Sequence, residues 1–284
     1  MDGDILSGPD ARGGGIALNR IERCFEKLRA CGDKALVCFL TSGDPDFAVT
    51  VKLVTEIARC GADIVELGVP FSDPLADGPS IQASSFRALE RGATVRAVFE
   101  NLRQIRTTCD VPIVLMTYYN PVHKYGLEAF AADAADAGAD GVILTDLPPE
   151  EAGDWKKAAD EAGLATIFLL APTSTKERIE LAAKFGTGFI YCVSRTGVTG
   201  ARDTMPAELE SLVETIKKAS ALPVVVGFGV SKPEHVSFVT QFADGAVVGS
   251  ALVNVIADHA GSNDLVRSAG EFVRSLKSGM VRRE

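Results

Sequence analysis

The feature that most constrains the fold is a regular alternation of short apolar runs with helical stretches along the chain. Eight apolar runs of strand length begin near residues 35, 63, 111, 141, 164, 186, 222 and 245. The helical stretches between and after them cover residues 47–59, 80–91 and 95–107, 127–137, 150–162, 176–184, 207–219, 233–242, 251–257 and 264–277. Strands separated by helices in this way pair in parallel, because a parallel neighbour needs a long crossover connection.

Eight such units without an intervening linker predict a single α/β domain, a (β/α)₈ TIM barrel with extra short helices. An amphipathic helix over residues 21–30 precedes the first strand, where it would cap one end of the barrel. We expect the catalytic domain to span residues 19–278, with a flexible leader at 1–18 and a tail at 279–284. The alternative is a doubly wound open sheet, but no G-x-G-x-x-G opens the first helix, which counts against dinucleotide binding.

One acidic residue, Glu66, interrupts the apolar run Ile64-Val65-Glu66-Leu67. Side chains alternate along a strand, so Glu66 shares a face with Ile64 while Val65 and Leu67 point the other way. An ionised carboxylate in such a place costs several kcal/mol unless it is paired or used. An ion pair with a neighbouring strand is the alternative, yet the other strand candidates contain no Lys or Arg. Glu66 is therefore the leading candidate for a general acid–base group with a raised pKa.

A proline-rich loop follows Glu66 and carries Asp73 and Asp77. Strand ends of this kind form the mouth of a barrel, where active sites lie. Asp77 precedes Gly78 and suits an Asx-type turn, although its carboxylate could also accept a hydrogen bond from a substrate N–H group. Turn chemistry alone favours the structural role for Asp77, and more strongly for Asp73.

Glycines follow the last three predicted strands, at 197–200, at Gly227-Phe228-Gly229 and at Gly249-Ser250, which opens a short helix. Barrels often bind phosphate at these loops, where backbone N–H groups and a helix N-terminus face the anion. Apolar side chains also fall near the strand ends: Phe39, Met116, Tyr118, Ile143 and Phe228. Together these features fit a planar apolar substrate with a phosphate tail.

Composition excludes several other classes of function. The net charge of −9 argues against nucleic acid as a partner. Six scattered cysteines without a C-x-x-C pair indicate reduced thiols and a cytoplasmic protein, and three dispersed histidines give no metal-ligand spacing. No apolar run reaches the ~18 residues of a membrane span.

The stretches E-L-G-V-P-F-S-D-P-L-A-D-G-P-S-I-Q, S-R-T-G-V-T-G, G-F-G-V-S and G-S-A-L-V closely resemble those of the tryptophan synthase alpha chain family, in the same order, over residues 19–278. The resemblance implies a barrel that cleaves indole-3-glycerol phosphate to indole and glyceraldehyde 3-phosphate without a metal or cofactor in this chain. It also implies a partner beta chain that holds pyridoxal phosphate, an alpha-beta-beta-alpha assembly and transfer of indole between the two chains.

Site roles follow from the resemblance, motif by motif. Glu66 matches the catalytic glutamate, Asp77 the catalytic aspartate, and Tyr191 a supporting tyrosine, so the resemblance moves Asp77 from turn to catalysis. The phosphate-binding positions are Gly200, Gly227, Phe228, Gly229, Gly249 and Ser250. The indole-pocket positions are Phe39, Met116, Tyr118 and Ile143, although Met116 and Ile143 stand where some relatives have leucine.

Two loops, at residues 69–79 and 195–203, resemble the closing and signalling elements of the family. The second is expected to open without ligand. Two other functions stay open: a free-standing indole-releasing lyase with the same site, and a non-catalytic barrel that only binds phosphate ligands. The presence of both Glu66 and Asp77 argues against the last one.

Overall fold

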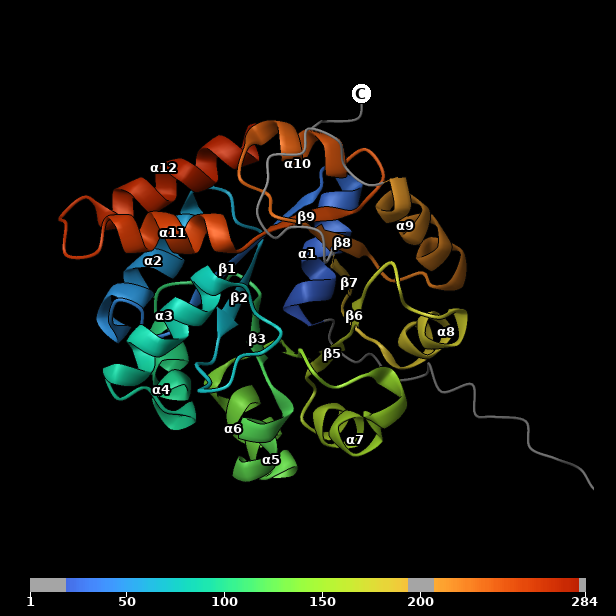
Figure 1. The fold of residues 1–284 in the computed structure, drawn as a ribbon, viewed down its shortest axis with the longest axis horizontal. Coiled ribbons are helices and arrows are strands. Elements are labelled where there is room, and N and C mark those ends of the chain that lie inside the picture. The colour runs from blue at the N-terminus through green and yellow to red at the C-terminus, as the bar shows by residue number, and fades with distance from the viewer. Residues whose placement is uncertain (1–18, 194–206, 281–284) are drawn as a thin grey trace, which may run out of the picture.

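The computed structural model describes residues 19–193 and 207–280, which form a ring of helices around a parallel sheet (Figure 1). The strands are β1 (Ala35–Thr41), β2 (Ile64–Gly68), β3 (Ile113–Thr117), β4 (Gly141–Leu144), β5 (Ala165–Ile167), β6 (Leu169–Leu170), β7 (Ile190–Val193), β8 (Val224–Gly227) and β9 (Gly245–Val248). The helices are α1 (Arg20–Ala30), α2 (Phe47–Arg59), α3 (Pro79–Glu90), α4 (Val95–Arg106), α5 (Tyr119–Tyr125), α6 (Leu127–Ala137), α7 (Gly153–Glu161), α8 (Lys176–Phe185), α9 (Ala207–Ala219), α10 (Pro233–Val239), α11 (Ser250–Asp258) and α12 (Leu265–Lys277).

The sheet is a nearly closed parallel barrel with the strand order β5-β4-β3-β2-β1-β9-β8-β7-β6. Its two outermost strands, β5 and β6, follow each other in the chain with only Phe168 between them. β5 pairs with β4 and β6 pairs with β7, so one segment contacts both neighbours and closes the ring. The barrel prediction is confirmed, with one difference. The strand expected near residue 164 is divided into two short strands, because β5 pairs with β4 and β6 pairs with β7.

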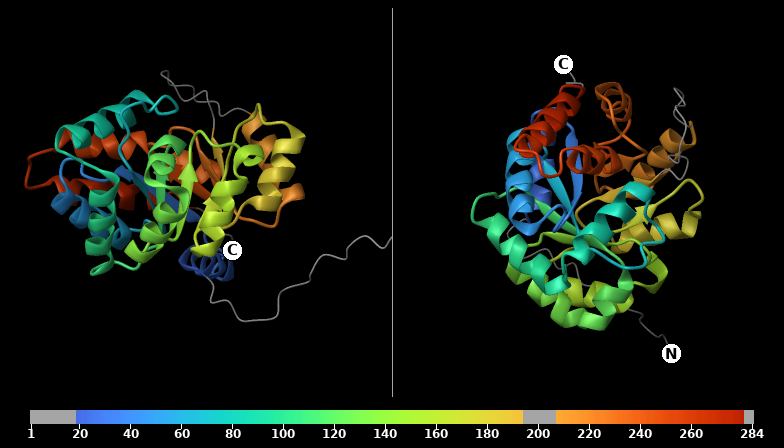
Figure 2. Two further views of the ribbon diagram at one scale, coloured as in Figure 1. Left: turned by 90° about the horizontal axis from the view of Figure 1, so that it is seen from below. Right: turned by 60° about the vertical axis from the view of Figure 1, so that its left-hand side comes forward.

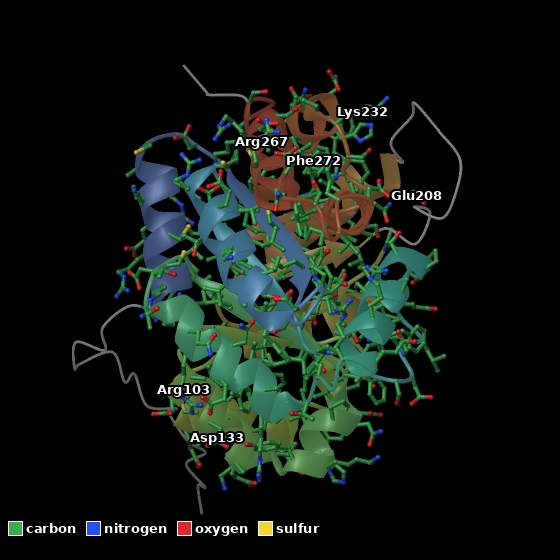
Figure 3. The ribbon with its side chains drawn as sticks, turned by 90° about the vertical axis from the view of Figure 1, so that its left-hand side faces the viewer. Arg103, Asp133, Glu208, Lys232, Arg267 and Phe272 are labelled. Carbon is green, nitrogen blue, oxygen red and sulfur yellow. The ribbon has the colours of Figure 1, made fainter. Side chains whose placement is uncertain are left out.

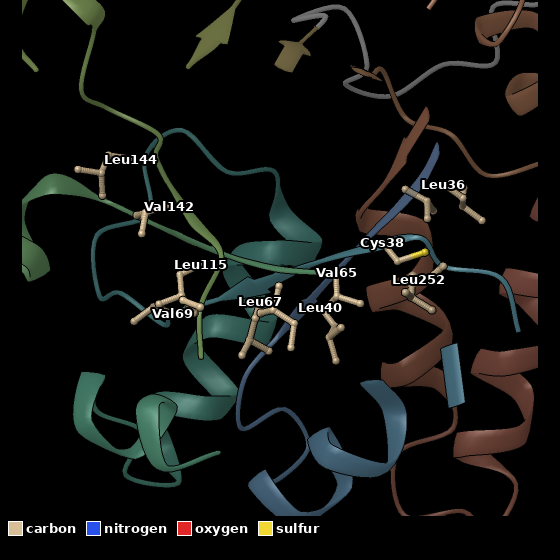
Figure 4. Packing of buried hydrophobic residues seen from close by; sticks show 14 of the residues in the cluster. Leu36, Cys38, Leu40, Val65, Leu67, Val69, Leu115, Val142, Leu144 and Leu252 are labelled. Carbon is tan, nitrogen blue, oxygen red and sulfur yellow. The ribbon is translucent and has the colours of Figure 1, made fainter. Parts of the chain in front are cut away.

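Two apolar layers follow from the alternation of side chains along the strands. Leu36, Cys38 and Leu40 point outward from β1 and pack with Val65 and Leu67 of β2 against the helices (Figure 4). The side chains on the opposite faces of the strands fill the interior of the barrel. They include Val37, Ile64, Val114, Ile143, Tyr191, Val225 and Val247. Strands covered on both faces explain why their sequences read as continuous apolar runs.

Helix α1 covers one end of the barrel, as the sequence predicts, and lies beneath the sheet in the left view of Figure 2. Ile21 and Phe25 belong to the apolar cluster of the barrel interior. Asn19 begins the helix with a capping box, in which the Glu22 side chain accepts a hydrogen bond from the Asn19 backbone N–H. The Asn19 side chain also donates to the backbone oxygen of Asp140. The helix is thereby fixed at the N-terminal ends of the strands.

Asp140 holds several elements together at this same end of the barrel. Its Oδ2 accepts bonds from the backbone N–H of Ile113 at 2.8 Å and from Arg106 at 2.7 Å, while its Oδ1 accepts from Arg20 at 3.1 Å. One carboxylate therefore joins α1, α4 and β3 at the start of β4. Its position far from the strand C-termini marks it as a stability element.

Most helix boundaries lie within a few residues of the expected ones, but two segments differ. Helix α5 lies between β3 and α6 and was not predicted, and residues 150–162 are divided into a short 3-10 helix, η1 (Pro149–Glu151), and α7. Charged side chains such as Arg103 and Arg267 lie on the outer helices (Figure 3). In the described part of the chain, no helix is long and apolar enough to cross a membrane. The expected leader and the end of the tail, residues 1–18 and 281–284, lie outside the described residues.

Candidate active site

Glu66 points into the barrel interior from the middle of β2. It stands in register between Phe39 of β1 and Val114 of β3, and it is 1% exposed. Neither of its carboxyl oxygens has a hydrogen-bond partner among the described residues. Burial without compensation raises the pKa of Glu66 to about 8, so the carboxyl is largely protonated at neutral pH. The ion pair weighed as an alternative is absent from the described residues.

Tyr191 enters the same interior from β7 and is buried. Burial raises the pKa of its phenol well above the usual range, and the negative charges of Glu66 and Asp77 raise it further. The phenol is therefore neutral, and it lies close enough to both acids to be affected by their charge. The structure thus brings these three sequence-predicted residues together.

Asp77 lies near the end of the loop that joins β2 to α3. Its backbone N–H donates to the carbonyl of Pro74 at 3.1 Å and closes a backbone turn over residues 74–77, whereas the sequence suggested an Asx-type turn made by the Asp77 side chain. Burial raises the pKa of Asp77 to about 6, although the nearby Tyr118 hydroxyl acts in the opposite direction. Asp77 thus lies at the end of a backbone turn with its carboxylate at the barrel mouth, and its bond to a substrate N–H group stays a prediction.

Tyr118 contacts the loop that carries Asp77. The Tyr118 hydroxyl accepts a bond from the backbone N–H of Ala76 at 2.9 Å, and its ring lies 5.2 Å from that of Phe71. Because Tyr118 follows β3 directly, these contacts tie the loop to the neighbouring strand. The position of Asp77 is therefore set by a side chain of the barrel itself.

A small pocket opens beside Asp77 at the C-terminal ends of β1, β2 and β3. Three of the predicted indole-pocket residues, Phe39, Met116 and Tyr118, line it together with Asp77. Ile143 does not: it is fully buried in the barrel interior. The rest of the lining is Gly68, Val69, Phe71, Ile81, Ser85, Thr117 and Thr145.

Two of the lining residues that sequence reasoning missed, Ile81 and Ser85, come from α3. Their spacing of four residues, which the sequence does show, places them on one face of a helix. That spacing alone does not show that the face lines a pocket, because residues that face the core have the same spacing. Only the packing of α3 across the barrel mouth identifies them.

The glycines after β8 and β9 lie on neighbouring strands, since Gly227 is in register with Val247. Gly249 and Ser250 begin α11, whose first turn carries no acidic residue and no side-chain cap. Gly229 has a φ of +88°, and a Cβ there would meet open space. Gly229 and the residues that begin α11 present backbone near a helix N-terminus, which is suited to an anion, whereas the Tyr191 side chain covers one side of Gly227.

The start of α11, at Gly249 and Ser250, borders the pocket. A Cβ placed on Gly249 would lie 3.8 Å from both Ile81 and Phe39, two pocket residues. Phe228 turns its ring toward His235, with centroids 5.8 Å apart. Gly200 and the predicted loop 195–203 lie outside the described residues. A largely apolar pocket beside Asp77 thus adjoins backbone suited to an anion at Gly229 and Gly249–Ser250, which matches a ligand with a flat apolar body and an anionic tail.

Acid–base chemistry on such a ligand is what the arrangement allows. A protonated carboxyl lies in an apolar interior, and a second carboxyl at the rim is ionised above about pH 6. The first can donate a proton to a carbon or take one from a hydroxyl, and the second can stabilise a positively charged N–H group. No group of His, Cys, Asp and Glu that could hold a metal occurs in residues 19–193 or 207–280.

Comparisons with known proteins agree with this geometry. The family model of the tryptophan synthase alpha chain matches residues 25–280. The tryptophan synthase alpha chain of Geobacter sp. (strain M21) is 52% identical over 93% of this chain and 99% of its own length, and that of Thermoanaerobacter sp. (strain X514) is 45% identical over 92% and 99%. The crystal structure of the Legionella pneumophila tryptophan synthase subunit alpha superposes with a TM-score of 0.86 at 39% identity, covering 93% of this chain and 98% of that one. This chain belongs to the tryptophan synthase alpha chain family.

Proposed function

We propose that this chain is the alpha subunit of tryptophan synthase, a carbon–carbon lyase that cleaves indole-3-glycerol phosphate to indole and glyceraldehyde 3-phosphate. The observation that carries the site assignment is the Glu66 carboxyl, buried in the barrel interior near Tyr191 and without a hydrogen-bond partner in residues 19–193 and 207–280. Leaving a carboxyl there without a partner is costly unless the reaction uses it.

Glu66 begins the proposed cycle in its protonated form, which its raised pKa favours. It donates its proton to ring carbon C3 of the substrate, and the ring becomes a cationic indolenine. Asp77, ionised above about pH 6, accepts a hydrogen bond from the ring N–H and stabilises that charge.

The carboxylate now left on Glu66 takes the proton from the adjacent hydroxyl of the glycerol side chain. The bond between C3 and the side chain breaks, its electron pair returns to the ring as indole, and the side chain leaves as the aldehyde. Glu66 is protonated again at the end, so one carboxyl serves both steps. Tyr191 is proposed to support Glu66 as a neutral phenol within the same interior.

Phosphate binding is proposed at Gly227, Phe228, Gly229, Gly249 and Ser250, with Gly200 as a further contact. The N-terminus of α11 supports this, because helix dipoles favour anions at that end. Phe39, Met116 and Tyr118 are proposed to contact the indole ring, and Ile143 to support the floor beneath it. Residues 19–278 are proposed to act as one catalytic domain.

The family works with a beta subunit, and no cofactor is expected in the alpha chain. We propose that indole passes to a beta chain that holds pyridoxal phosphate, within an alpha-beta-beta-alpha assembly in the cytoplasm. The six cysteines are all free thiols, which is consistent with that location.

The test is release of indole from indole-3-glycerol phosphate by the purified chain, alone and after addition of a beta chain. Cleavage that accelerates when the beta chain is added is expected. Full-speed cleavage without any effect of a beta chain would favour the free-standing lyase. A folded chain that binds the substrate and releases no indole under either condition would contradict the proposed function.

A further inference from the structure

The loop that carries Asp77 is held on one side by Tyr118 and on the other by Gln82 of α3. Its tip is exposed, with Leu75 91% accessible to solvent. The Gln82 side-chain amide donates from Nε2 to the backbone oxygen of Asp77 at 2.9 Å and to that of Pro74 at 3.3 Å. The same turn is closed by the bond from the Asp77 N–H to the Pro74 oxygen. One side chain thus joins both ends of the turn that presents the Asp77 carboxylate.

This contact requires a hydrogen-bond donor at the end of the side chain at position 82. An NH₂ group has two N–H donors, and Gln82 directs them to two carbonyl oxygens that can only accept. A carboxylate of the same shape would place negative oxygen against both carbonyls. The contact therefore distinguishes glutamine from glutamate, although the two side chains have nearly the same volume.

Helix α3 gives Gln82 a fixed base. Arg87 binds Asp44 with two bonds, Nε to Oδ1 at 2.8 Å and Nη2 to Oδ2 at 2.7 Å, and Asp44 is 3% exposed. One turn earlier, the Ser84 hydroxyl lies 2.6 Å from that of Thr41 at the end of β1. These contacts attach α3 to the end of β1 and to the loop that follows it, so Gln82 extends from a fixed element toward the turn.

We propose that Gln82 is a positioning residue for the lyase reaction: from α3 it fixes the turn 74–77 so that the Asp77 carboxylate meets the ring N–H of the substrate. This inference rests on the proposed function of Asp77. Gln82 does not touch the reacting atoms. It acts through the backbone of Asp77, while Tyr118 acts on the carboxylate itself.

The experiment compares Gln82→Glu, Gln82→Met and Gln82→Lys with the wild-type chain. Gln104→Glu on α4 is the matched control, since Gln104 is exposed and the change in charge is the same. The kcat and KM for indole release, the midpoint of thermal unfolding and the pH profile of kcat/KM are measured for each. A misplacement of a reacting group by about 1 Å can cost on the order of 10²-fold in rate.

Gln82→Glu and Gln82→Met are expected to lower kcat by about 10-fold to 100-fold with KM changed less, and to move the acidic limb of the pH profile. Gln82→Lys, which keeps N–H donors, should recover a large part of the loss, and Gln104→Glu should behave as the wild type. Wild-type kcat in both Gln82→Glu and Gln82→Met would overturn the proposal. So would a lower unfolding midpoint with an unmoved pH limb, because that shows a purely structural role. Failure of the wild-type chain to release indole would instead count against the proposed function.

Discussion

The Tyr191 side chain occupies the space that a side chain at position 227 would need. A Cβ placed on Gly227 would lie 2.5 Å from the Tyr191 hydroxyl oxygen and 2.8 Å from its ring carbon Cε2. The two residues come from the paired strands β7 and β8. The absence of a side chain at position 227 therefore allows the Tyr191 phenol to occupy its place in the interior.

Gly227→Ala is expected to displace the Tyr191 ring and to lower kcat/KM for indole release by roughly 10-fold or more, since small displacements at a reacting centre are costly. Tyr191→Phe removes the atom in closest contact but keeps Cε2, so the double variant should recover part of the activity that Gly227→Ala loses. Gly153→Ala is the control, because a Cβ there meets open space. Additive losses in the double variant would contradict this account of the contact.

The pH dependence of the reaction follows from the two carboxyl groups. Glu66 must start protonated, and this form is lost as the pH rises through about 8. Asp77 must be ionised, and this form is lost as the pH falls through about 6. The profile of kcat/KM should therefore be bell-shaped, with an acidic limb near pH 6 and a basic limb near pH 8.

Asp77→Asn tests the assignment of the acidic limb. Its amide cannot ionise, so the remaining activity should lose the fall below about pH 6 while it keeps the fall above about pH 8. Rates of indole release at fixed substrate across this range give the measurement. An acidic limb that persists unchanged in Asp77→Asn would assign that limb to another group.

The barrel and its acid could be predicted because each depends on local sequence. Alternation within β2 fixes Glu66 on the same face as Ile64, and the structure has both in the interior. Other features depend on packing between distant segments. Nothing in the run from residue 164 shows that its halves pair with β4 and β7, and nothing around Ser85 shows that α3 crosses the pocket. Ile143 was assigned to the pocket by resemblance; it is fully buried and does not line the pocket, although β4 places it in register with Met116, which does.

Asp140 is expected to support stability and not catalysis. Asp140→Ala leaves the guanidinium of Arg106, whose side chain is only 11% exposed, without its carboxylate partner. Removing one member of such a pair typically costs about 3–5 kcal/mol. Because Arg106 keeps bonds to the backbone oxygens of Gly138 and Val111, a loss of about 3 kcal/mol in the free energy of unfolding is expected.

Denaturant unfolding measures this loss, with kcat for indole release as the second readout. Asp136→Ala is the matched control, since Asp136 forms an exposed ion pair with Arg103 on the outer surface. The control should unfold near the wild-type denaturant concentration. A normal free energy of unfolding for Asp140→Ala, or a selective loss of kcat, would contradict the structural role.

Glu66→Gln tests most directly whether the Glu66 carboxyl, buried and without a partner among the described residues, carries the proton in both steps. The amide fits the same space but cannot transfer a proton, so indole release should fall by at least ~10²-fold to 10⁴-fold while the chain remains folded and binds substrate. Glu161→Gln, an exposed position on α7, provides the control. A single-turnover assay with indole-3-glycerol phosphate should show this loss in Glu66→Gln alone, and near-normal indole release by that variant would contradict the account.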